Sequence, residues 1–185
     1  MSALIQTSGR KKVATKKRTQ IPRRKLFAER QSSPSDSRLF NYSLNYKKLN
    51  LKEHPELYRV GVGEQGVLLV EPYKSEILPH WKFKTPEDAL QSAQEIMMLF
   101  RSYRKKHDFI GMDMARKFLQ MGFTRARRYA NHRSGRKYSS TGRLLPFAND
   151  TEKAKSAEIF YQAWKRVEAD RIYSAQKAAW KQHYG

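Results

Sequence analysis

The chain has 185 residues, with 38 Lys and Arg against 17 Asp and Glu, which gives a formal net charge of +21. Hydrophobic residues make up 39% of the sequence and aromatic residues 12%, enough for a packed core, so disorder over the whole chain is excluded. The absence of Cys excludes disulfide scaffolds, thiolate zinc sites, iron–sulfur clusters and cysteine nucleophiles, and no apolar run approaches the length of a membrane span, about 18 residues.

Two segments carry nearly all of the excess positive charge. Residues 1–38 hold 11 Lys and Arg against 2 acids, and residues 101–143 hold 13 against 2. A concentration of like charge raises the local potential and attracts anions. Because a net charge of about 2–8 is enough for solubility, the excess predicts a polyanionic partner.

The first of these segments, residues 1–38, is predicted to be a flexible, disordered basic arm. Its composition cannot bury enough apolar area to offset the loss of conformational entropy. Its basic clusters are typical of a nuclear-import signal and predict a nuclear location, with the mitochondrion or the cytoplasm as alternatives. The candidate polyanion-binding residues of the arm are Lys11, Lys12, Lys16, Lys17, Arg18, Arg23, Arg24 and Lys25.

Short strands are predicted directly after the arm. Apolar and polar residues alternate over 40–46, which is typical of a half-buried strand. Residues 57–62 and 66–70 are two further strand candidates, and the glycines around 63–66 favour a hairpin turn between them. A fourth short strand is predicted over 77–83, interrupted by a proline.

Helices are predicted for most of the remaining chain. Thr85 is a candidate N-cap, because Pro and acidic residues follow it and apolar residues then recur at spacings of three and four. A second helix is expected over 112–121, with Gly122 interrupting it before a short third helix that begins near Thr124 and runs through residue 130.

Asp150 is a candidate N-cap of a last helix that extends to about residue 181. Residues 133–150 have no periodicity and predict a long loop that is either functional or disordered. The predicted fold class is therefore α+β, in which a small antiparallel sheet is followed by three or four helices. We expect a single domain over 39–183.

Two patterns suggest chemistry. Gly61, Gly63 and Gly66 form a G-x-G-x-x-G motif, but a strand-like sequence follows it where a dinucleotide-binding fold requires a helix, so the glycines indicate a hairpin. A cluster around Glu71, Glu76 and His80 could perform acid–base work in a suitable cleft, or could be an ordinary polar turn. The five His residues are scattered without ligand spacing, so no metal site is predicted.

The most informative pattern is the arginine-rich segment 118–138. Arginine forks suit bidentate phosphate binding and stack on bases, and the neighbouring Tyr129, Asn131 and Tyr138 could add stacking and hydrogen bonds. The candidate nucleic-acid-binding residues of this segment are Arg125, Arg127, Arg128, Arg133, Arg136 and Lys137.

Three longer stretches, 54–66, 71–81 and 111–132, resemble a domain-of-unknown-function family numbered 4385. The resemblance covers about residues 40–170 and leaves the basic arm outside. It implies one compact domain, and it implies no reaction and no catalytic residue.

The sequence thus predicts a protein that binds DNA or RNA without catalytic activity or a cofactor, through a basic helix-and-loop patch and the cationic arm. One alternative is an enzyme that acts on nucleic acid or on a phosphorylated small molecule. A cleft that joins Glu71, Glu76 or His80 to the arginines would favour that alternative. Another is a structural subunit of a ribonucleoprotein particle. The oligomeric state is not predicted.

Overall fold

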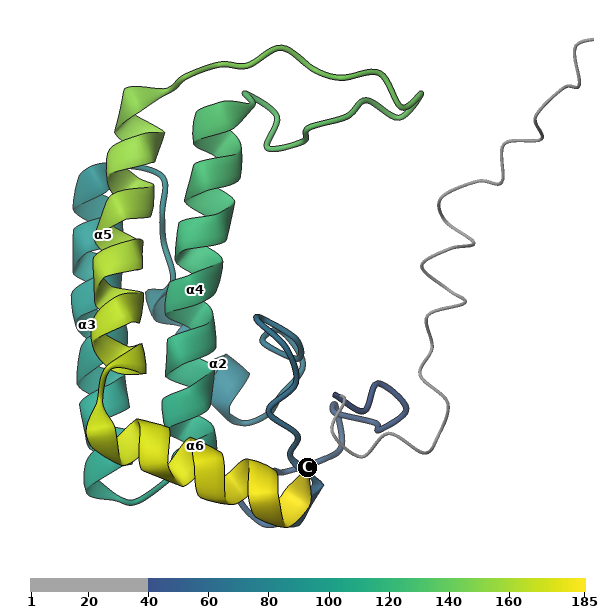
Figure 1. Cartoon of the computed structure of the whole chain (residues 1–185), viewed down its shortest axis with the longest axis vertical. Helices are drawn as coiled ribbons and strands as arrows, with labels where there is room; N and C mark the ends of the chain where they lie inside the picture. Colours follow the sequence, from purple (N-terminus) through teal and green to yellow (C-terminus); the bar gives the residue numbers. More distant parts are fainter. Residues whose placement is uncertain (1–39) are drawn as a thin grey trace, which may run out of the picture. The chain divides into compact units, whose positions relative to one another are not determined.

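The computed structural model describes residues 40–185, and this part of the chain is helical (Figure 1). Its regular elements are η1 (Pro55–Leu57), α2 (Tyr73–Ile77), η2 (Leu78–His80), α3 (Pro86–Lys105), α4 (Phe109–Asn131), α5 (Thr151–Glu168) and α6 (Arg171–Tyr184). Residues 40–185 contain no strand, and the only β-type pairing among them is an isolated antiparallel bridge between Tyr138 and Leu144. The predicted α+β fold is therefore wrong.

Helices α3, α4 and α5 lie side by side, and α6 crosses one end of this bundle (Figure 1). Helix α4 is the centre of the structure, because every residue from Phe109 to Leu119 is buried. A helix buried on all sides needs neighbours on all sides. α3 and α5 cover one side of α4, while α2, α6 and the irregular segment 40–72 cover the rest.

The segment 40–72, in which three strands were predicted, consists of turns and the short helix η1, packed against α4. The rings of Phe40 and Tyr46 are buried and stack on each other with their centroids 5.2 Å apart, so the alternating pattern buries some of its aromatic residues without a sheet. Gly61, Gly63 and Gly66 all have positive φ, between 62° and 79°. They bend the chain repeatedly, and a β ladder cannot form across such bends.

The fourth predicted strand, over 77–83, is also wrong. Ile77 ends helix α2, residues 78–80 form the short helix η2, and only residues 81–84 run without helical structure into α3. A proline at the first or second position of η2 fits this geometry, because its fixed φ suits the first turn of a helix.

The predicted helix N-caps are confirmed at Thr85 and Asp150. The Thr85 hydroxyl accepts a hydrogen bond from the backbone N of Asp88, and the Asp150 carboxylate accepts one from the backbone N of Lys153. Such caps satisfy backbone donors that have no partner inside the helix.

Two predicted helix boundaries are wrong. Helix α4 runs through Gly122 without interruption, because this glycine lies in the helix interior where the ring of Phe160 leaves no room for a side chain. The predicted last helix is divided into α5 and α6 at Ala169 and Asp170, and the Asp170 carboxylate caps α6.

Candidate nucleic-acid interface

The C-terminal end of α4 presents three of the predicted arginines to solvent. Ala126 and Ala130 are buried on the inner face of the helix, and Arg125, Arg127 and Arg128 lie exposed on the remaining faces. The small inward residues let neighbouring elements approach closely, and the 3.6-residue period then turns the arginines outward. The three guanidinium groups are therefore carried by a rigid element, the last turns of α4.

The segment 132–150 continues this surface as a hydrogen-bonded loop that extends from the end of α4 (Figure 1). Its base is closed by two backbone bonds of 2.9 Å, from Ala148 N to Asn131 O and from Asp150 N to Ala130 O. Further along, the backbone N of Leu145 donates to Lys137 O at 2.9 Å, next to the Tyr138–Leu144 bridge. The loop thus folds back on itself as a small hairpin.

The predicted residues of this loop, Arg133, Arg136 and Lys137, are all exposed. Within residues 40–185, no salt bridge joins any of the six predicted basic side chains to an acid. Two of the six lie near aromatic rings instead: the Arg127 guanidinium carbon is 6.0 Å from the centroid of Phe123, and Lys137 Nζ is 5.6 Å from that of Tyr138. These cations remain available to an anionic ligand.

The charge of residues 101–143 does not form one surface. Helix α4 has 23 residues and is about 34 Å long, and it runs antiparallel to α3. The cations at the end of α3 therefore lie at the opposite end of the bundle from the exposed arginines of α4. One of them, Arg104, pairs with Asp170 at 3.3 Å.

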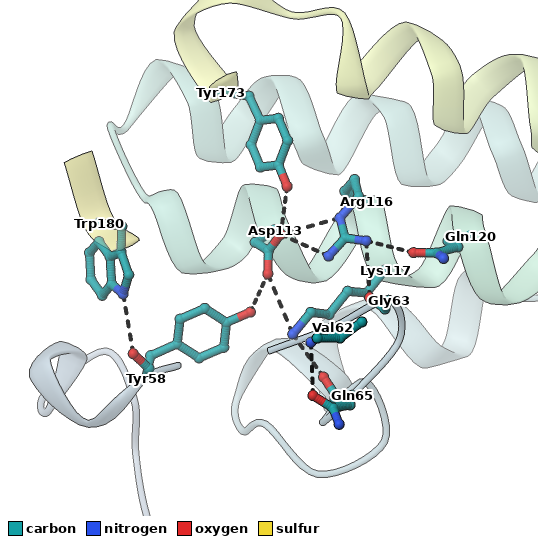
Figure 2. A network of polar contacts seen from close by, with 10 residues as sticks. All are labelled: Tyr58, Val62, Gly63, Gln65, Asp113, Arg116, Lys117, Gln120, Tyr173 and Trp180. Carbon is teal, nitrogen blue, oxygen red and sulfur yellow. Dashed lines mark hydrogen bonds and ion pairs between the residues drawn. The ribbon is translucent and has the colours of Figure 1, made fainter. Parts of the chain in front are cut away.

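Two further cations of this stretch, Arg116 and Lys117, are buried and belong to a polar network centred on Asp113 (Figure 2). The Arg116 guanidinium donates to Asp113 Oδ1 through Nε and Nη2, at 3.2 and 3.0 Å, and Lys117 Nζ lies 3.4 Å from Asp113 Oδ2. The hydroxyls of Tyr58 and Tyr173 also donate to the same carboxylate. The network thus joins α4 to α6 and to the irregular segment.

Backbone carbonyls complete the network. Arg116 Nη1 donates to Gly63 O at 3.0 Å, and Lys117 Nζ donates to Gln65 O at 2.8 Å. The charged side chains of α4 thus satisfy carbonyl groups that a β ladder would otherwise have satisfied. This arrangement explains how the glycine-rich turn is held without a sheet.

Burial and charge set the protonation of this network. Burial by itself raises the pKa of Asp113, but the adjacent Arg116 and Lys117 and the two tyrosine hydroxyls outweigh it and hold that pKa well below its usual range. Burial lowers the pKa of Lys117 to about 8, against the opposing effect of Asp113. The same burial raises the pKa of Tyr58 well above its ordinary value.

The three candidate acid–base residues, Glu71, Glu76 and His80, each form ion pairs or hydrogen bonds with different side chains. Glu71 pairs with Lys74, Glu76 pairs with Lys52 and accepts a hydrogen bond from Tyr103, and His80 Nδ1 lies 2.7 Å from a Glu95 oxygen. Glu76 lines a cavity that also includes Lys52, Leu99, Ser102, Tyr103, Lys106 and Asp108. None of the predicted arginines lines this cavity.

Neither a metal cluster nor a membrane span is found in the described part of the chain. Among residues 40–185, no three His, Asp or Glu side chains gather as ligands for a metal ion. No helix in this range combines the length and the apolar character that crossing a bilayer requires.

Sequence reasoning missed several residues of this end of the bundle. Arg143 is exposed in the same hairpin as Lys137, and its position in the basic stretch was a sufficient signal. Trp81 and Phe83 line a cavity beside this surface, together with Tyr129, which the sequence had indicated as a stacking residue. Lys82 and Phe83 fall within the predicted strand 77–83, and this prediction gave no indication of a cavity.

The arm residues Lys11, Lys12, Lys16, Lys17, Arg18, Arg23, Arg24 and Lys25 lie outside the described residues. The family model described as domain of unknown function (DUF4385) matches residues 41–183. The chain therefore belongs to this family, as its sequence motifs predicted. Comparisons with curated proteins and with solved structures find no match.

Proposed function

We propose that this member of the DUF4385 family is a nucleic-acid-binding protein without catalytic activity. The proposal rests on one observation: Arg125, Arg127, Arg128, Arg133, Arg136 and Lys137 are exposed together at one end of the bundle, and no acid within residues 40–185 forms a salt bridge with them. A single exposed ion pair contributes little to stability. A set of unpaired cations on one surface, by contrast, produces a positive potential that attracts a polyanion.

The residue types favour contacts to phosphate over contacts to base edges. Five of the six side chains are arginines, whose planar forks bind phosphate in a bidentate manner. Such contacts position the protein on a backbone without reading its sequence. We therefore expect weak sequence selectivity, with the cationic arm adding further phosphate contacts.

The test compares two triple variants of the full chain that lose the same charge. One variant carries Arg133→Ala, Arg136→Ala and Lys137→Ala in the loop. The matched control carries Arg101→Ala, Lys105→Ala and Lys106→Ala, which are exposed at the opposite end of the bundle. Fluorescence anisotropy with duplex DNA, single-stranded DNA and RNA over a salt series measures the dissociation constants.

The loop variant should bind every sequence more weakly than the control. For duplex DNA, the slope of log affinity against log salt should fall by about 0.9 for each lost phosphate contact, or about 2.7 for three. An equal loss in both variants would mean that only the total charge matters, and the proposed surface would be wrong. No binding by the unchanged protein at low salt would overturn the function itself.

A further inference from the structure

A cavity of about 460 Å³ lies at the end of the bundle where α4 ends and where α3 and α5 begin. Its lining residues are Trp81, Lys82, Phe83, Lys84, Asp88, Tyr129 and Lys153. Its volume falls in the range of small-molecule pockets, about 300–1,000 Å³. Tyr129 comes from the same turn of α4 as the exposed arginines.

Three aromatic rings follow one another along this cavity. The centroid of Phe83 is 4.9 Å from that of Trp81 and 5.9 Å from that of Tyr129. Trp81 is fixed in place, because its Nε1 donates a hydrogen bond to Phe118 O at 3.1 Å. The aromatic surface therefore exists before any ligand arrives, and 38% of Tyr129 is exposed to solvent.

The charges around the cavity distinguish between possible occupants. Lys82 and Lys84 are exposed, Lys153 is half-buried and donates to the backbone carbonyl of Lys84, and Asp88 is the single acid among the lining residues. A lysine ammonium has three donors, so Lys153 keeps two after its bond to Lys84. An apolar wall with a cationic rim is complementary to a flat base joined to a phosphate, and less so to an uncharged apolar side chain.

The basic loop contacts one of the aromatic rings that line the cavity. A Cβ added at Gly135 would lie 2.9 Å from Cζ of Tyr129, so the loop backbone rests directly on this ring. Gly135 lies between Arg133 and Arg136, both exposed. A strand that placed one base against Tyr129 would therefore have these arginines within reach of its neighbouring phosphates.

We propose that this cavity binds an unpaired nucleobase of a single-stranded nucleic acid, stacked against Phe83 and Tyr129. The phosphates of the strand on either side of that base would contact Lys82, Lys84 and Lys153. This inference rests on the proposed function and deepens it, since it names single strands as the preferred partner. Duplex DNA would still bind through the basic loop, but its paired bases could not enter the cavity.

The experiment uses the full chain and two fluorescent single strands of equal length, one ordinary and one whose nucleotides are all abasic. The affinity for the ordinary strand should be at least about tenfold higher than for the abasic strand, because base stacking on aromatic side chains contributes strongly to such binding. Equal affinity for the two strands would overturn the proposal while leaving the phosphate-binding function intact. If neither strand nor a duplex bound, the proposed function would fail as well.

A variant locates the effect. Phe83→Leu keeps an apolar side chain but removes the ring, so it should reduce the preference for the ordinary strand about tenfold and leave duplex binding unchanged. The matched control is Tyr42→Leu, which removes an exposed ring outside the cavity. An unchanged preference in Phe83→Leu, with an unchanged helical circular dichroism spectrum, would show that the stacking occurs elsewhere and would also overturn the proposal.

Discussion

The ring of Phe160 on α5 occupies the space in which residue 122 of α4 would carry a side chain. A Cβ on Gly122 would lie 2.4 Å from Cδ1 of Phe160, and the phenylalanine is fully buried. The absence of a side chain at Gly122 thus allows α4 and α5 to approach closely. Glycine disfavours a helix when only local propensity is considered, but in this protein Gly122 allows the close packing of two helices.

Gly122→Ala should therefore destabilise the protein, although alanine favours a helix by about 0.5–1 kcal/mol over glycine. Overpacking a buried contact costs about 1–3 kcal/mol, so the clash with Phe160 should outweigh that gain. Urea unfolding followed by circular dichroism measures the difference. In a Phe160→Leu background the same substitution should cost less, and an increase in stability from Gly122→Ala alone would contradict this account.

Asp113→Asn should lower the free energy of unfolding by about 3–5 kcal/mol at neutral pH. The amide keeps the shape of the side chain but leaves the charges of Arg116 and Lys117 buried without their carboxylate. Chemical unfolding measures the loss, with the exposed Glu158→Gln as a control for removal of a carboxylate. Similar losses in the two variants would mean that the buried network contributes little.

Acid should act through the same carboxylate. The pKa of Asp113 is depressed in the folded protein, so the unfolded chain takes up its proton first as the pH falls below about 4. The stabilisation by Asp113 is present above that pH and is lost below it. Between pH 5 and pH 2.5, the free energy of unfolding should therefore change less with pH for Asp113→Asn than for the unchanged protein. An equal dependence on pH in the two proteins would contradict the prediction.

The buried ammonium of Lys117 should cause a second rise of stability with pH, in the same direction but in the alkaline range. Its pKa is about 8 when folded and about 10.4 in an unfolded chain, so the unfolded state binds more protons between these values. Stability should therefore rise from pH 7.5 to 9.5, on the order of 1 kcal/mol, relative to Lys117→Met. The range stops there because tyrosines with raised pKa values, such as Tyr46 at about 12, oppose the effect above pH 10.

Arg143→Ala should weaken binding to all nucleic-acid sequences by a similar factor and lower the salt slope for duplex DNA by about 0.9. The side chain is exposed in the same hairpin as Lys137, whose carbonyl accepts the backbone bond from Leu145. Anisotropy titrations measure both quantities, with Lys106→Ala at the other end of the bundle as control. A loss confined to one sequence would indicate that Arg143 reads a base.

The sequence by itself determined the features that depend on neighbouring residues. Thr85 and Asp150 cap helices because a side-chain oxygen needs only the backbone three residues ahead, and this spacing is visible in the chain. The exposure of Arg125 and Arg128 also follows from the helical period that buries Ala126 and Ala130. The family motifs are likewise a property of the chain alone.

Only the tertiary structure decided which partner satisfies the backbone of residues 40–72. The alternation around Phe40 and the glycines at 61–66 are local signals for strands. The segment instead forms turns with local backbone hydrogen bonds, and buried side chains of α4 donate to the carbonyls of Gly63 and Gln65. The same applies to Gly122, whose meaning depends on Phe160, and to the cations of 101–143, which antiparallel helices separate by the length of α4. Contacts between residues far apart in the chain override local preference because they bury more surface and satisfy more polar groups than any single turn can.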